Sequence, residues 1–169
     1  GVFAALVQDG LVFYVDFLDG ASYPGSGLYL SNLGSAGASL DWELAGSPVF
    51  VQGSTNADTY MNFDSTDDYG YVKSINDLGS ILTTNMTVGW IVQSTDLDRG
   101  MVASKSTGGA GYLAAFQTNG NFYNSEVGSA TSYIDKVGNS DSEGLDGSFH
   151  MLEFKDVDFT GWTTGQGIN

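Results

Sequence analysis

The hydrophobic positions of this chain fall in short runs separated by glycine, asparagine, aspartate and serine. Runs of this kind, rich in β-branched and aromatic side chains, are typical of the strands of an all-β sandwich. No segment keeps the apolar period of a helix over several turns; residues 74–82 come closest, with one helical turn. The predicted strands are residues 11–17, 60–63, 69–72, 86–92, 100–104, 111–116 and 149–154.

One connection between strands can be predicted from two residues. Asn119-Gly120 separates the apolar run 113–116 from Phe122-Tyr123. Asn-Gly suits the type I′ turn of a hairpin, because both residues tolerate positive φ. The chain has 169 residues, without an internal repeat or a linker, which predicts one domain over residues 1–169.

The charge balance narrows the classes of partner. The 20 acidic and 5 basic residues give a formal net charge of −15. Nucleic acid and anionic membrane surfaces both require clustered Lys and Arg, so neither is expected as a partner. Cysteine is absent, which excludes disulfides and Cys-ligated zinc. No apolar run approaches the length that spans a bilayer, so no membrane insertion is expected.

Three carboxylates lie between two predicted strands, in the segment "MNFDSTDDYGY" that begins at Met61. Asp64, Asp67 and Asp68 could supply part of the oxygen shell that calcium prefers. The spacing lacks the glycine and the terminal glutamate of an EF-hand loop. Asp side chains also cap backbone N–H groups in tight turns, and a purely structural role in such a turn is favoured over a metal site. Both interpretations remain open at the level of the sequence.

The sequence offers little catalytic chemistry. None of its glutamates has the Glu-x-Asp-x-x-Glu spacing that places glucanase carboxylates on one face of a strand. The sole histidine, His150, lies inside an apolar run, where a packed residue is expected rather than a triad base. No Gly-x-Ser-x-Gly or phosphate-binding glycine motif is present. We therefore predict that the chain is not an enzyme.

Aromatic side chains are the candidates for a ligand site. Sugar-binding sites stack an aromatic ring on the apolar face of the sugar and add polar groups around it. The predicted ligand-binding residues are Tyr23, Tyr29 and Trp42, of which Tyr23 precedes Pro24 in a turn and is expected to be exposed. Most other aromatic residues are expected in the core, where such side chains contribute most to packing.

Ordered segments of the chain resemble the concanavalin A-like, laminin-G-like jelly-roll domains. The opening "SYPGSG" at residues 22–27 and the loop "FDSTDDYGYV" at 63–72 are similar to motifs of that family. Further similar segments, in the same order as in the family, are "MTVGWIVQS" (86–94), "MVASK" (101–105), "GYLAAFQTNGNFY" (111–123) and "DGSFHMLEF" (146–154).

The resemblance implies a concanavalin A-like jelly-roll β-sandwich of antiparallel sheets. In relatives the acidic loop often binds calcium, with further ligands late in the chain, where Asp156 and Asp158 are the candidates here. Domains with this opening are common in bacteriophage virion proteins and bacterial surface proteins. The resemblance thus implies a location on a virion surface, or an extracellular or cell-surface one, and other subunits of that assembly as partners.

The chain departs from the family at two places. Ser65 stands where the family often has glycine, and only residues 155–169 follow the last matching strand. Family members usually continue there with strands that pair with the first one. Because an open sheet edge invites pairing, we expect the first strand or the end of the chain to contact another chain or segment.

Two functions follow as expectations. The first is a non-catalytic structural or decoration domain exposed on a virion or cell surface, with glycans as the ligands it could adhere to. The alternative is a carbohydrate-binding module of a secreted enzyme or adhesin. The fold cannot decide between them, because this scaffold hosts many functions.

Overall fold

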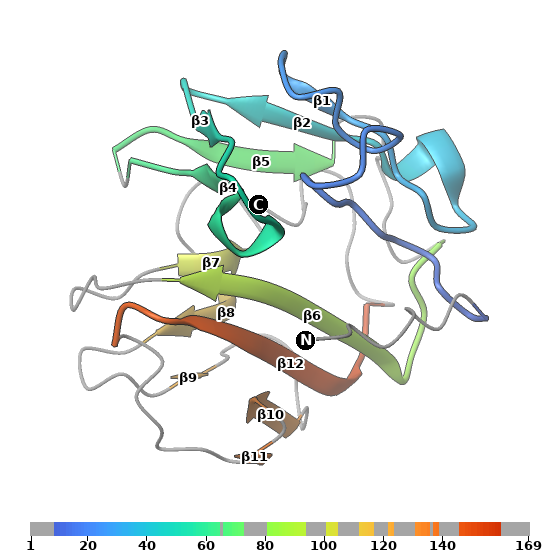
Figure 1. Cartoon of the computed structure of the whole chain (residues 1–169). Helices are drawn as coiled ribbons and strands as arrows, with labels where there is room; N and C mark the ends of the chain where they lie inside the picture. The colour runs from blue at the N-terminus through green and yellow to red at the C-terminus, as the bar shows by residue number, and fades with distance from the viewer. Residues whose placement is uncertain are drawn as a thin grey trace. The chain divides into compact units, whose positions relative to one another are not determined.

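The computed structural model describes residues 9–64, 66–72, 81–93, 101–104, 112–116, 122–123, 131–135, 137–138 and 146–159. These residues form strands, turns and two short 3₁₀ helices, η1 (Gly37–Leu40) and η2 (Asn56–Asp58), so the predicted all-β class is confirmed (Figure 1). Contacts divide the chain into two compact units, residues 1–75 and 76–169. None of the described helices is long and apolar enough to cross a bilayer.

The first unit contains a three-stranded antiparallel sheet and a separate antiparallel pair. The order is β1-β2-β5 in the sheet, and β3 pairs with β4 (Figure 1). Their bounds are β1 (Tyr29–Leu30), β2 (Trp42–Ala45), β3 (Val49–Val51), β4 (Tyr60–Asn62) and β5 (Tyr69–Val72).

The two faces of the β1-β2-β5 sheet differ in character. On one face Trp42 lies between Leu30 and Val72, both buried. Leu30 and Leu44 belong to a buried cluster with Tyr23 and Met61, against which Val15, Phe17, Trp42 and Phe50 pack. Since successive side chains of a strand alternate between faces, the residues between these point away from the core. The described core cluster of this unit therefore lies against this face of the sheet.

Residues 11–17 do not form the predicted strand. The Asn32 side chain accepts the backbone N–H of Tyr14 at 2.7 Å, and Ser22 Oγ accepts that of Asp16 at 3.0 Å. Side chains thus satisfy backbone groups that a strand would pair in a ladder. The segment still packs inward, because Val15 and Phe17 contact the core cluster.

The second unit contains a four-stranded sheet in the order β11-β10-β12-β6 and a three-stranded sheet in the order β7-β8-β9. All described pairings are antiparallel. The strands are β6 (Met86–Gln93), β7 (Met101–Ser104), β8 (Tyr112–Phe116), β9 (Phe122–Tyr123), β10 (Thr131–Ile134), β11 (Val137–Gly138) and β12 (Phe149–Val157).

An irregularity in β12 changes which of its side chains are buried. Leu152 and Phe154 are fully buried, two positions apart, as alternation requires. The register against β6 then shifts between Phe154 and Val157, and Asp156 has a positive φ of 61°. An extra residue in one strand resets its alternation, and Val157 is again buried. Trp90 of β6 packs edge-on against Phe154, with ring centroids 6.3 Å apart, as expected of a core residue.

Most of the predicted strands are confirmed, namely those that became β4, β5, β6, β7, β8 and β12. β8 and β9 pair antiparallel, as the Asn119-Gly120 hairpin predicts, although the turn itself lies outside the described residues. Residues 73–80, which include most of the predicted helical turn, also lie outside them. The jelly-roll arrangement and the single domain over residues 1–169 stay predictions.

Candidate functional site

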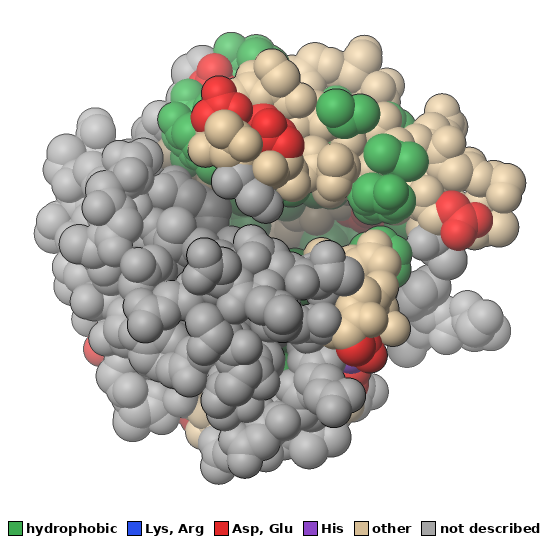
Figure 2. Space-filling model, turned by 90° about the vertical axis from the view of Figure 1, so that its left-hand side faces the viewer, with side chains coloured by type: hydrophobic (Ala, Val, Ile, Leu, Met, Phe, Trp, Pro, Cys, Tyr) green, Lys and Arg blue, Asp and Glu red, His purple; other side chains and the backbone are tan. Residues whose placement is uncertain are grey.

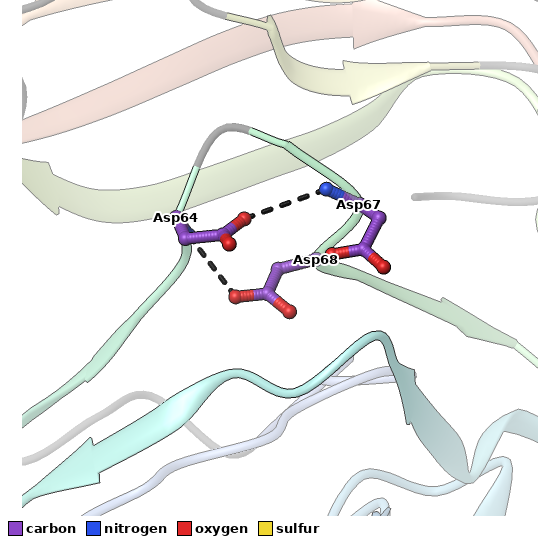
Figure 3. Close-up of side chains that lie close together, drawn as sticks. All are labelled: Asp64, Asp67 and Asp68. Carbon is purple, nitrogen blue, oxygen red and sulfur yellow. Dashed lines mark hydrogen bonds between the residues drawn. The ribbon is translucent and has the colours of Figure 1, made fainter.

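The three predicted calcium ligands lie together in the turn between β4 and β5 (Figure 3). One carboxylate oxygen from each of Asp64, Asp67 and Asp68 lies within 4.8 Å of the others. Asp64 and Asp67 are exposed, and Asp68 is half-buried. The three carboxylates thus lie close enough together to share a cation, and calcium binding stays a prediction.

The carboxylates of Asp64 and Asp68 hold the turn together. Asp68 Oδ2 accepts the backbone N–H of Asp64 at 3.0 Å, and Asp68 Oδ1 accepts that of Ser47 at 2.5 Å. Asp64 Oδ1 accepts the backbone N–H of Thr66 at 2.8 Å and that of Asp67 at 3.4 Å (Figure 3). These are the contacts of an Asx-type turn, which the sequence favoured over a metal site.

The carboxylate of Asp67, unlike those of Asp64 and Asp68, accepts no backbone hydrogen bond of the described turn. No donor of the described residues reaches it, and it lies beside the carboxylate of Asp68 (Figure 3). Calcium takes six to eight oxygen ligands, so this turn can supply a part of a shell but not all of one. Asp156 and Asp158, the later candidates, are exposed residues of the second unit.

The three predicted ligand-binding aromatic residues do not form one site. Tyr23 is 4% exposed, its ring packs edge-on against Phe17 and Phe50, and its hydroxyl donates to the Gly27 carbonyl. The expectation that Tyr23 is exposed is wrong, because its turn folds back onto the core of the unit. Trp42 is half-buried on the core face, where its ring covers Gly70. Only Tyr29, which is 57% exposed, presents its ring to solvent.

Tyr29 belongs to an aromatic surface that the sequence analysis missed. We call it the tyrosine face: Tyr29 on β1, Glu43 on β2, and Tyr69 and Tyr71 on β5. Glu43 pairs with Tyr29 on one side and with Tyr71 on the other, so the three form a row across the sheet. Tyr69 follows two positions along β5, and its ring centroid lies 5.7 Å from that of Tyr71. The alternation Tyr-Gly-Tyr in β5 was the available sequence signal for two of these rings.

The tyrosine face is partly exposed, and Oε2 of Glu43 is buried within it. Tyr29 is 57% and Tyr69 is 40% exposed, while Tyr71 and Glu43 are half-buried. Neighbouring strands lie about 4.8 Å apart, which separates Tyr29 from Tyr71 by roughly 10 Å across β2. Rings at this spacing on a sheet surface can each cover a different unit of an extended ligand. A carboxylate between them can accept hydrogen bonds or pair with a cation.

The electrostatics of the first unit limit what this face can bind. Every charged side chain among its described residues is a carboxylate. In the view of Figure 2, acidic side chains lie beside hydrophobic ones on the described surface. A ligand that carries sulfate, phosphate or uronate groups would be repelled. The geometry and charge thus favour a neutral or cationic ligand.

His150 lies in a second cluster of ionisable groups, in the second unit. Its Nδ1 is 2.7 Å from Asp135 Oδ2, and its Nε2 is 2.9 Å from Asp146 Oδ1. A triad base needs one ring nitrogen for the nucleophile, and here both face carboxylates. The ring is half-buried.

Comparison with known proteins adds no relative: no family model, no curated protein and no solved structure matches the chain.

Proposed function

We propose that the chain is a non-catalytic domain, exposed on a virion or cell surface, that adheres to glycans through the tyrosine face. The observation that carries the proposal is the row of Tyr29, Glu43 and Tyr71 on the side of the β1-β2-β5 sheet that faces away from the described core cluster. Aromatic rings cover the apolar faces of sugars, and a carboxylate accepts hydrogen bonds from their hydroxyl groups. The resemblance to concanavalin A-like jelly-roll domains of bacteriophage and bacterial surfaces supports the location.

The class of glycan follows from charge. A carboxylate at the centre of the face, in a unit whose described charges are all negative, favours neutral saccharides or those with amino groups. Saccharides with uronate, sulfate or sialate groups are disfavoured. Calcium, if the turn of Asp64, Asp67 and Asp68 binds it, would stabilise the connection that leads into β5.

The non-catalytic part of the proposal rests on the carboxylates and the histidine. Asp64 and Asp68 accept backbone N–H groups of their own turn, and both nitrogens of His150 face carboxylates. The same face would equally serve a carbohydrate-binding module of a secreted enzyme or adhesin. Assembly with other subunits of a virion or surface layer favours the first function, and retention on a polysaccharide without assembly favours the module.

The proposal is tested by retention on immobilised polysaccharides. The chain should be retarded by a neutral glucan or mannan, or by an amino-sugar polymer, and pass through an anionic one. Tyr29→Ala should be retarded less than the unaltered chain. Val49→Ala is a matched control, because Val49 on β3 is also 57% exposed and lies off the face. Equal retention of the two variants, or no retention of the unaltered chain on any neutral or cationic polymer, would refute the proposal.

A further inference from the structure

His150 joins two turns of the second unit to the start of β12. Asp135 comes from the turn between β10 and β11, and Asp146 from the turn that precedes β12. The side chain of His150 is only 13% exposed, whereas those of Asp135 and Asp146 are 52% and 41% exposed. The imidazole ring therefore lies between two carboxylates that water reaches and that come from separate turns.

The protonation state of the ring decides how many of these contacts are favourable. An imidazolium ion donates from both nitrogens, so it can bind Asp135 and Asp146 at once. A neutral imidazole donates from one nitrogen and presents a lone pair at the other, which would face a carboxylate oxygen. The distances of 2.7 and 2.9 Å place each ring nitrogen within hydrogen-bond reach of a carboxylate, and only the protonated ring can donate at both.

Each carboxylate also fixes backbone groups. Asp135 Oδ1 accepts the backbone N–H of Met151 at 2.9 Å, and the backbone N–H of Asp135 donates to the Met151 carbonyl, also at 2.9 Å. Asp146 Oδ1 accepts the backbone N–H of Ser148 at 2.7 Å. Gln93 of β6 donates from its side chain to the Gly147 carbonyl. The ring thus connects to the backbone of both turns through its two partners.

The other side of the ring carries no charge among the described residues. His150 pairs with Val92 across the β12–β6 ladder, and the neighbouring pair is Phe149 with Gln93. Among the described residues, the charged groups that face His150 are Asp135 and Asp146. A change in the ring charge acts directly on these two contacts.

We propose that His150, Asp135 and Asp146 form a pH-sensitive latch: the imidazolium binds both carboxylates and holds both turns against β12, and loss of its proton releases one of them. The latch is independent of the proposed glycan function, because all of its residues lie in the second unit.

The direction of the switch follows from the ionisable groups. Burial by itself lowers the pKa of His150, but hydrogen bonds and charges from Asp146 and Asp135 outweigh it and raise the pKa above 6.5. A raised pKa in the folded state contributes stability that is fully present below pH 6.5. That stability is lost as the pH rises through the folded-state pKa. The latch is thus closed at pH values below the folded-state pKa of His150 and open at pH values above it.

His150 is the sole histidine of the chain, so its ring protons give one unambiguous NMR titration. We expect a pKa above 6.5, lowered in both Asp135→Asn and Asp146→Asn. Hydrogen-exchange protection at the Ser148 or Met151 amide should fall several-fold as His150 loses its proton, because one turn is released. A pKa at or below 6.5, or protection of both amides that does not change through the titration, would overturn the latch.

The variant His150→Gln provides the matched measurement, because it cannot become charged. Its amide protection at residues 148 and 151 should not depend on pH between 5.5 and 8.5. If this variant does not fold, Asp146→Asn replaces it, since the Asp146 side chain is exposed at the surface. In Asp146→Asn the ring has one carboxylate partner left, so the amide that responds in the unaltered chain should lose its dependence on the His150 titration. An unaltered dependence would contradict the proposal.

Discussion

The carboxylate of Asp68 accepts a hydrogen bond from the backbone N–H of Ser47 at 2.5 Å, across 21 positions of the chain. The contact joins the turn after β4 to the turn after β2. Gly46 makes room for it: a Cβ there would lie 2.3 Å from Asp68 Oδ1, and Gly46 has a positive φ of 78°. The acidic turn therefore has a structural role whether or not it binds a metal.

Asp68→Ala should destabilise the first unit, and Asp67→Ala should not. Asp68 accepts two backbone hydrogen bonds, and their loss from a half-buried site should cost about 1–2 kcal/mol. Asp67 accepts none from the described residues, so its removal should change the free energy of unfolding by less than about 0.5 kcal/mol. Unfolding by denaturant in the presence of EDTA measures the change in the free energy of unfolding for both variants. Equal destabilisation by the two variants would contradict the assigned roles.

Calcium bound by Asp64, Asp67 and Asp68 should raise the melting temperature of the chain. A site at 100 times its Kd adds about 2.7 kcal/mol, which is several degrees for a chain of this size. Asp67→Ala should remove the shift and leave the melt in EDTA unchanged, because Asp67 is the ligand not used by the turn. A melt of the unaltered chain that does not respond to millimolar calcium would leave the three residues with the turn role alone.

The buried side chain of Asn32 makes four hydrogen bonds with backbone groups in and around the N-terminal segment. It is 7% exposed; its Oδ1 accepts from Tyr14 and Gly34, and its Nδ2 donates to the Val12 and Gly37 carbonyls. Asn32→Ala should cost about 2–4 kcal/mol, because several part-buried backbone groups lose their partners together.

The control for Asn32 is Asn62→Ala, in the same unit. Asn62 ends β4 and is exposed, so its removal should cost less than about 0.5 kcal/mol. Chemical denaturation gives both values. A small effect of Asn32→Ala would mean that the segment around Tyr14 is held by packing rather than by this side chain.

The strands that the sequence predicted share one property: their apolar pattern is local and several residues long. Residues 86–92 and 149–154 became β6 and β12, the two longest strands. β1 has two residues and β2 reads Trp-Glu-Leu-Ala, so neither offers enough alternation to stand out. β2 pairs with β1 on one side and, on the other, with β5, which lies further along the chain.

The sites were harder to predict because they depend on register. The closeness of Asp64, Asp67 and Asp68 in space follows from their closeness in sequence. Tyr23 precedes a proline in a turn, which suggested exposure, yet Phe17 and Phe50 bury it. The row of Tyr29 and Tyr71 requires the order β1-β2-β5, and sequence spacing alone does not give that order.

The loss of folded-state stability at acidic pH should depend on Asp135. Hydrogen bonds from the Met151 backbone and His150 lower the pKa of Asp135 below 3.8. A lowered pKa contributes stability that is present above pH 3.8 and lost as the pH falls through the folded-state value. Asp135→Asn should therefore lower the melting temperature at pH 5.5 and flatten its decline below pH 4. A decline as steep as that of the unaltered chain would show that other carboxylates determine acid unfolding.

The tyrosine face predicts that the ring of Tyr71, and not its hydroxyl, carries the glycan contact. Tyr71→Phe keeps the ring and should retain binding within about three-fold, whereas Tyr71→Ala should weaken it about ten-fold or more, since covering an aromatic side chain is worth about 1.5–3 kcal/mol. Combining Tyr71→Ala with Tyr29→Ala should weaken binding further, because the two rings lie on either side of Glu43 and contact different parts of an extended saccharide. Affinity electrophoresis in gels that contain the polysaccharide measures the series, with Val49→Ala as the control. If Tyr71→Phe and Tyr71→Ala weaken binding equally, the hydroxyl rather than the ring makes the contact, and stacking is the wrong description of this face.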